Sequence, residues 1–140
     1  MAITRQASRQ QLVPIIFGQH AVAASQTDVQ LPIVIGEKDA AVDGTVAPFA
    51  GRIVAVAAST SAAATAGSLT VGATINGTED ADTRLTVTTQ VDKYLTIGRG
   101  KARFAAGDRI GCEITTTAAW DAITEHLSAT VYVLYDMDGI

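Results

Sequence analysis

Short runs of β-branched residues, each closed by a turn signal, limit this chain to β structure. The run at 68–75 is the clearest, because Leu69 and Val71 alternate with small or polar residues. Asn76-Gly77 follows it, and this pair is a strong signal for a hairpin turn. Val and Ile together number 25 against 7 Leu, and Thr adds 18. Branched side chains lose less freedom on a pleated sheet than in a helix, so the composition favours an all-β fold.

Further runs of this kind recur at spacings near the roughly 8–12 residues expected of a β-sandwich or barrel. Helical patterns do not alternate with them, so a parallel sheet with crossover helices is disfavoured. The predicted strands are 29–35, 51–58, 68–75, 84–89, 94–98, 102–104, 109–116 and 127–136. The predicted core contains Leu69, Val71, Ile75, Leu85, Val87, Ile110, Ile114, Val131 and Val133.

One segment, 118–127, has a helical pattern, with Trp120, Ile123 and Leu127 at positions i, i+3 and i+7. A structured loop is an equal alternative, because a connection of about ten residues between two strands is ordinary. The sequence leaves both interpretations open.

The N-terminal segment 1–27 differs in charge from the rest of the chain. It holds Arg5 and Arg9 and no acidic residue, so it is formally +2; the whole chain is −4, and the remainder is therefore −6. Such an asymmetry is typical of an arm that reaches onto another surface, while a frayed terminus is the alternative. We predict an extended arm over 1–27 and one β-sandwich domain over 28–140.

The arm is expected to bind a partner through charge and apolar contact. Ordering a segment costs about 1–2 kcal/mol per residue, whereas each of the two arginines, if exposed, contributes at most about 1 kcal/mol. The short apolar run, set in a groove or beside a neighbouring subunit's sheet, is therefore expected to supply most of the binding. The predicted partner-binding residues are Arg5, Arg9, Leu12, Ile15, Ile16 and Phe17.

Residues that usually carry catalysis or bind metals are few and scattered. His20 and His126 are far apart, and neither belongs to a metal-binding motif. Cys112 is the single cysteine, which excludes an intrachain disulfide, and it is interpreted as a small buried apolar residue. The sequence contains no nucleophile elbow, phosphate-binding loop or dinucleotide motif. We therefore expect a protein that is not an enzyme and has no cofactor or metal.

Two carboxylate clusters could hold a hard cation, since calcium loops place oxygen ligands at alternate positions. They comprise Glu79, Asp80 and Asp82, and Asp136 with Asp138. Neither has the glycine and distal glutamate of an EF-hand loop, so solvated loop charge is the favoured interpretation.

The overall charge argues against nucleic acid and anionic membranes as partners. The chain has 10 Lys and Arg against 14 Asp and Glu. One basic group, Arg99, Lys101 and Arg103, would lie on one side of an extended segment. It is a candidate contact for phosphate, a glycan or an acidic protein surface, while a charged edge that prevents strand aggregation is the alternative.

The sequence shows no pattern typical of a membrane span or of a secretory signal. No stretch approaches the roughly 20 consecutive apolar residues of a membrane span. The first residues contain two arginines, but no apolar segment of a secretory signal follows them. We therefore expect the protein to be made and folded in the cytoplasm of the host cell.

The segment 105–120, AAGDRIGCEITTTAAW, and the later strand LSATVYVLYD resemble the C-terminal half of jelly-roll head domains. Such domains occur in capsid decoration proteins of tailed phages, in trimeric phage fibre tips and in trimeric tumour-necrosis-factor or complement-type modules. The resemblance extends over residues 50–136 in strand order. For the decoration proteins, it implies a trimer of jelly rolls on three-fold positions of an icosahedral shell, with the N-terminal arm on the major capsid protein.

With the strand pattern, the resemblance predicts an eight-stranded antiparallel jelly-roll sandwich or a closely related barrel; an OB-like or immunoglobulin-like domain is the alternative. The predicted function is a capsid decoration, or cement, protein that binds the outside of a phage head and stabilises the coat lattice. The alternative is a receptor- or carbohydrate-binding fibre tip, with Trp120 and the polar loops at Asn76 and Asp121 as contacts. A cupin-like enzyme needs a histidine cluster that two histidines cannot form.

A homotrimer is the expected assembly. The resemblance implies it, and the last predicted strand is apolar on both faces, with Tyr132 and Leu134 opposite Val131 and Val133. Such a strand needs a second cover besides its own core. Packing between subunits can supply that cover, and a closed three-fold arrangement leaves no adhesive surface. The expected partners are copies of the same chain and the major capsid protein, on the virion exterior.

Overall fold

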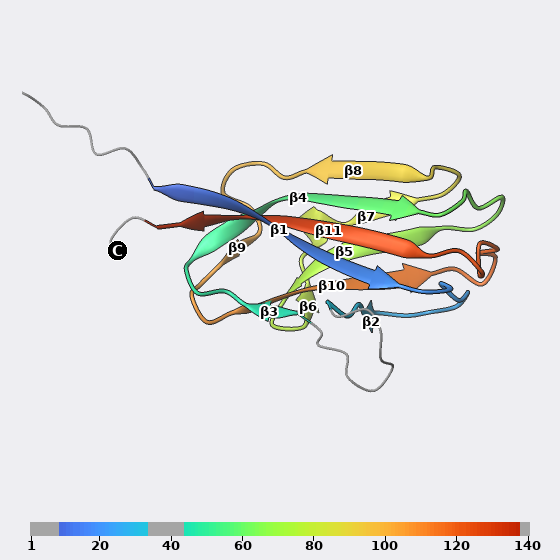
Figure 1. Ribbon diagram of the computed structural model, residues 1–140, viewed down its shortest axis with the longest axis horizontal. Coiled ribbons are helices and arrows are strands. Elements are labelled where there is room, and N and C mark those ends of the chain that lie inside the picture. The colour runs from blue at the N-terminus through green and yellow to red at the C-terminus, as the bar shows by residue number, and fades with distance from the viewer. Residues whose placement is uncertain (1–8, 34–43, 138–140) are drawn as a thin grey trace, which may run out of the picture.

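Strands form nearly all of the regular structure in the computed structural model, which describes residues 9–33 and 44–137 (Figure 1). Every strand pair in these ranges is antiparallel, so the fold is all-β, as predicted. None of the helical structure in the same ranges is long and apolar enough to cross a membrane. The elements are β1 (Gln10–Gln19), β2 (Val29–Gln30), β3 (Thr45–Val46), β4 (Gly51–Thr60), β5 (Leu69–Ile75), β6 (Thr78–Glu79), the 3-10 turn η1 (Ala81–Thr83), β7 (Leu85–Val87), β8 (Asp92–Thr96), β9 (Arg103–Phe104), β10 (Arg109–Thr116) and β11 (Leu127–Asp136).

Two sheets pack face to face, and their strand order is that of a jelly roll (Figure 1). Sheet A has the order β1-β11-β4-β8, with β9 also beside β4. Sheet B has the order β2-β10-β5-β6, with β3 also beside β10 and β7 also beside β5. Short strands that share a neighbour occupy one position, so each sheet has four positions. Lettered B to I along the chain, the positions read B-I-D-G and C-H-E-F, which is the order of the predicted jelly roll. The described residues form five strands in sheet A and six in sheet B, where eight strands were predicted in all.

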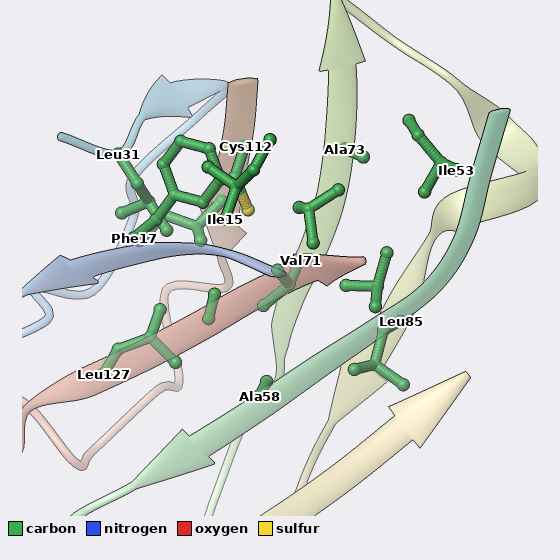
Figure 2. Packing of buried hydrophobic residues seen from close by; sticks show 14 of the residues in the cluster. Ile15, Phe17, Leu31, Ile53, Ala58, Val71, Ala73, Leu85, Cys112 and Leu127 are labelled. Carbon is green, nitrogen blue, oxygen red and sulfur yellow. The ribbon is translucent and has the colours of Figure 1, made fainter. Parts of the chain in front are cut away.

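The core lies between the sheets and is built from the inward residues of the long strands (Figure 2). Inward and outward residues alternate on β5 and β10, so that Val71 pairs with Ile114 and both are fully buried. Cys112 is fully buried too, as interpreted from the sequence. Ile75, at the end of β5, is only partly buried, unlike the rest of the predicted core. The confirmed core residues are Leu69, Val71, Leu85, Val87, Ile110, Ile114, Val131 and Val133.

The connection from β5 to β6 is the hairpin that Asn76-Gly77 predicts. Both residues have positive φ angles, 53° and 82°, as the two central positions of a type I′ turn require. The Asn76 side chain donates to Asp108 at 3.0 Å and accepts from the Arg109 backbone N–H at 2.9 Å. These bonds tie the turn to the start of β10 and support the register of the two strands.

The segment predicted as an extended arm, 1–27, contains the first strand of sheet A. β1 pairs with β11 along its whole length. Ile15 and Phe17 are 8% and 0% exposed, and Phe17 lies near Leu31 (Figure 2). This corrects the expectation that both residues anchor in a partner, because the alternation along β1 directs them into the chain's own core. Pro14 is tolerated because β1 is an edge strand.

A β-bulge in β4 determines which of its residues face the core. The register with β11 shifts by one residue at Val54. Ile53 and Val56 are therefore both fully buried, although residues three positions apart face opposite sides of a regular strand. The same shift leaves Arg52 and Ala55 on the side of the sheet that faces away from the core.

The segment 118–127 forms a loop with turns, so its helical interpretation is wrong and the structured loop is right. Trp120 is 2% exposed, and its Nε1–H donates to the Val22 backbone oxygen at 3.3 Å. Asp121 accepts from the Thr65 backbone N–H at 2.9 Å. Contacts with two distant segments therefore define this loop. Trp120 belongs to the core, which corrects the expectation of an exposed aromatic contact.

Phe17→Ala is expected to lower the free energy of unfolding by about 3–5 kcal/mol, because it removes a fully buried ring and leaves a cavity. Urea denaturation followed by circular dichroism measures the loss. Thr86→Ala, at an exposed position of β7, is the control and should change stability by less than about 1 kcal/mol. An effect of Phe17→Ala no larger than that of the control would show that β1 is not part of the folded domain.

Candidate functional site

The outer face of sheet A, the side turned away from the core, carries a band of mainly apolar side chains, interrupted by two threonines. Paired residues of antiparallel strands point to the same side, so strand pairing places their side chains next to one another. The rows across this face are Ile16, Thr130, Ala57 and Tyr94; Pro14, Tyr132, Ala55 and Thr96; and Leu12, Leu134, Arg52 and Arg103. The first two rows, with Leu12 and Leu134, form the apolar band.

The large side chains of the apolar band are open to solvent. Leu12 is 57% exposed, Ile16 55% and Tyr94 75%, and Tyr132 and Leu134 are half-buried between the flanking strands. Burying one large apolar side chain contributes about 1.5–3 kcal/mol to stability. Because the band is uncovered, the free chain lacks several such contributions. Contiguous exposed apolar surface of this kind marks interaction sites between proteins.

The outer face of sheet B has the opposite character. Its β5 positions are Thr70, Gly72 and Thr74, and the opposed β10 positions include Glu113 and Thr115. These residues are polar or small; Gly72, Thr74 and Glu113 are buried beneath neighbouring side chains, and Thr70 and Thr115 are partly exposed. The difference between the sheets identifies the outer face of sheet A as the candidate functional site.

The residues predicted to form the arm are divided between this face and the core. Leu12 and Ile16 lie on the outer face of sheet A, whereas the other two predicted anchors, Ile15 and Phe17, are core residues. Arg9 precedes β1, and its backbone oxygen accepts from the Met137 N–H at 2.7 Å. Arg5 lies outside the described residues. The apolar half of the predicted contact is therefore a sheet surface.

The predicted basic group does not lie on one side of an extended segment. The chain turns before β9 through a residue of left-handed backbone conformation, so the side chains diverge. Lys101 faces Asp82, with its Nζ 3.8 Å from Oδ1. Arg99 and Arg103 instead line a hollow of about 640 Å³ together with Arg52, at the end of the outer face of sheet A. Sequence reasoning missed Arg52, because strand pairing alone places it there.

The first carboxylate cluster has partners within its own loop, apart from the contact of Asp82 with Lys101. Glu79 accepts two hydrogen bonds from Arg84, at 3.0 and 2.9 Å. Asp80 caps η1 by accepting from the Asp82 backbone N–H at 2.9 Å. Within 9–33 and 44–137, no group of three or more His, Cys, Asp or Glu residues could hold a metal ion. The cluster therefore stabilises its own loop, and Asp138 of the second cluster lies outside the described residues.

Two histidines from distant parts of the sequence meet at one end of the sandwich. The ring centroids of His20 and His126 are 4.8 Å apart in an edge-to-face arrangement. The Ala21 backbone N–H donates to Nδ1 of His126 at 3.1 Å, so this nitrogen acts as an acceptor. No motif indicates the pair, because the pairing of β1 with β11 creates it. The histidines join the ends of these strands.

Two titratable groups are buried on β10. Burial raises the pKa of the Cys112 thiol, which makes it a poor nucleophile. Glu113 lies on the outer face of sheet B and is 7% exposed. Burial is the main cause of its raised pKa, and repulsion from Asp28 and Glu79 adds to the effect. Its Oε2 accepts from Gln30 Nε2 at 3.0 Å. Ionisation of Glu113 therefore opposes folding.

The sequence matches no protein-family model and no curated protein sequence. Among solved structures, the chain is similar to one in the acidic stable capsid structure of the Helicobacter pylori bacteriophage KHP30. The TM-score is 0.43 at 12% identity, over 89% of this chain and 93% of that chain. It is also similar to a chain of the virus-like particle of the extra small virus of the prawn Macrobrachium rosenbergii. There the TM-score is 0.40 at 14% identity, over 99% and 85% of the two chains.

Glu113→Gln is expected to raise the free energy of unfolding at about pH 8 and to change it less at about pH 4. Because the pKa of Glu113 is raised in the folded state, the native protein loses stability as the pH rises through that pKa. Glutamine keeps an oxygen acceptor for Gln30 and cannot ionise. Urea denaturation across this pH range measures the difference, with the exposed Asp92→Asn as control. Parallel pH profiles of Glu113→Gln and the native chain would contradict the prediction.

Proposed function

We propose that this protein is a structural component of a virus particle, a capsid decoration protein that binds the outside of an icosahedral phage head and stabilises its coat lattice. The observation that carries the proposal is the apolar band on the outer face of sheet A of a jelly-roll domain. A sheet face in permanent contact with water is normally polar, whereas this band is mainly apolar. The band therefore supports a role in assembly, through binding and not through catalysis.

The apolar band is the proposed contact between three copies of the chain. Its centre, formed by Pro14, Tyr132 and Ala55, carries no charge. The charged residues Arg52 and Asp92 lie toward opposite ends of the same face. An uncharged centre with a polar rim is the usual anatomy of a subunit interface. A closed three-fold ring covers each band and leaves no open adhesive surface.

The trimer is proposed to bind three-fold positions of the shell, with the segment that holds Arg5 and Arg9 on the major capsid protein. A protein that binds the assembled lattice and not the free coat subunits stabilises the lattice as binding saturates. The alternative of a carbohydrate-binding fibre tip loses its main contact, because Trp120 is buried and cannot stack on a sugar.

Ile16→Glu is expected to convert the trimer into monomers, because it places a charge within the apolar band. Light scattering should give about three times 14.5 kDa for the native chain and 14.5 kDa for the variant. Thr86→Glu, on the exposed outer side of sheet B, is the matched control and should remain trimeric. A monomeric native chain, or a trimeric Ile16→Glu variant, would show that the apolar band is not the contact between subunits.

Shells of the virus that encodes this chain should break at a higher temperature with the protein bound than without it, because binding to the lattice adds to its stability. Light scattering during heating measures the disruption temperature. Thr86→Glu should protect the shells as the native chain does. Equal disruption temperatures for bare and decorated shells would refute the cement role.

A further inference from the structure

A basic hollow lies at the end of the outer face of sheet A, where β4 and β9 pair. Arg52, Arg99 and Arg103 line it, and Asp136 is the one carboxylate among its described lining residues. Arg52 and Arg103 are directly opposite each other in the strand pair. Like charges in opposed positions repel, and with three arginines against one carboxylate the hollow keeps an excess of positive charge that a further negative group would reduce.

One arginine of the hollow, Arg52, also has a hydrogen-bond donor that is unused within the described part of the chain. Nη1 of Arg52 is buried and has no hydrogen-bond partner among residues 9–33 and 44–137. Within those residues, neither Arg99 nor Arg103 forms an ion pair with a carboxylate, whereas Arg84 and Lys101 each do. A buried donor without an acceptor is costly, and the planar fork of a guanidinium matches the two oxygens of a carboxylate. The hollow therefore has both the charge and the donors for an oxyanion.

We propose that this hollow binds the carboxylates of an acidic protein segment. Bidentate pairs between guanidinium and carboxylate groups are the strong and specific form of this contact. The volume of about 640 Å³ falls within the roughly 300–1,000 Å³ of sites for many-atom ligands, so the hollow has room for more than one carboxylate. Leu134 links the hollow to the apolar band. The acidic segment is assigned to the major capsid protein, and this assignment rests on the proposed function. The anion site itself does not depend on it.

Calorimetric titration of the full chain with a hexaglutamate peptide tests the site, and inorganic phosphate is the second titrant. Arg52→Gln and Arg103→Gln should each weaken peptide binding about tenfold, because each removes one charge-assisted pair. Lys101→Gln is the matched control, since this lysine is close in sequence but faces Asp82 and does not line the hollow. It should change the affinity by less than about twofold, as expected for an exposed charge.

Thermal unfolding in a buffer of low ionic strength separates binding from a structural role of the arginines. Because Arg52 and Arg103 repel each other, Arg103→Gln should unfold at the same temperature as the native chain or at a higher one. Hexaglutamate should raise the unfolding temperature of the native chain and, at the same concentration, raise that of Arg103→Gln by clearly less. A lower unfolding temperature for Arg103→Gln without peptide would assign this arginine a structural role and overturn the proposal.

Three titration results would also overturn the proposal: no binding of the peptide, binding of phosphate without binding of the peptide, or an equal loss of affinity in Lys101→Gln. The last result would mean that binding follows overall charge and not the hollow. All these measurements use the free chain, so they are independent of the shell experiment. Failure of the peptide titration leaves the cement role standing, and failure of the shell experiment leaves the anion site standing.

Discussion

The place of β11 in the middle of sheet A is the constraint on which the rest of the structure depends. Val131 and Val133 enter the core, while Tyr132 and Leu134 point outward between β1 and β4. A strand that is apolar on both sides is favourable only when both sides are covered. The core covers one side, and the neighbouring strands cover the other only in part. The apolar band is the consequence, and Ile16 is one of its most exposed residues.

The bulge in β4 has an effect at both surfaces of sheet A. It allows Ile53 and Val56 to enter the core together, and it keeps Arg52 on the outer side, opposite Arg103. Elsewhere the sheets follow the ordinary rules of pairing, with apolar residues opposed in the core and small or polar residues opposed on sheet B. A local departure from such rules is typical of a functional surface, where stability is given up for binding.

The two sheets thus have different tasks in the proposed assembly. The outer face of sheet B carries small and polar residues, and its buried Glu113 accepts a hydrogen bond from Gln30, an arrangement that links stability to pH without offering an apolar surface. At the end of the sandwich, the hydrogen bond from the Trp120 indole N–H to the Val22 backbone oxygen joins two loops. Sheet A is left as the surface through which copies of the chain and the shell can be bound.

Local signals were sufficient to place β10 and β11, whose observed bounds equal the predicted ones, and the hairpin at Asn76-Gly77. They were not sufficient for β1, for the burial of Trp120 or for the meeting of Arg52 with Arg103. Each of these depends on pairing between segments that are far apart in the chain. The two-residue period of a β-strand predicts which of its side chains share a face. Whether that face is covered is settled only when distant strands take their places beside it, because burial belongs to the assembled sheets and not to any one strand.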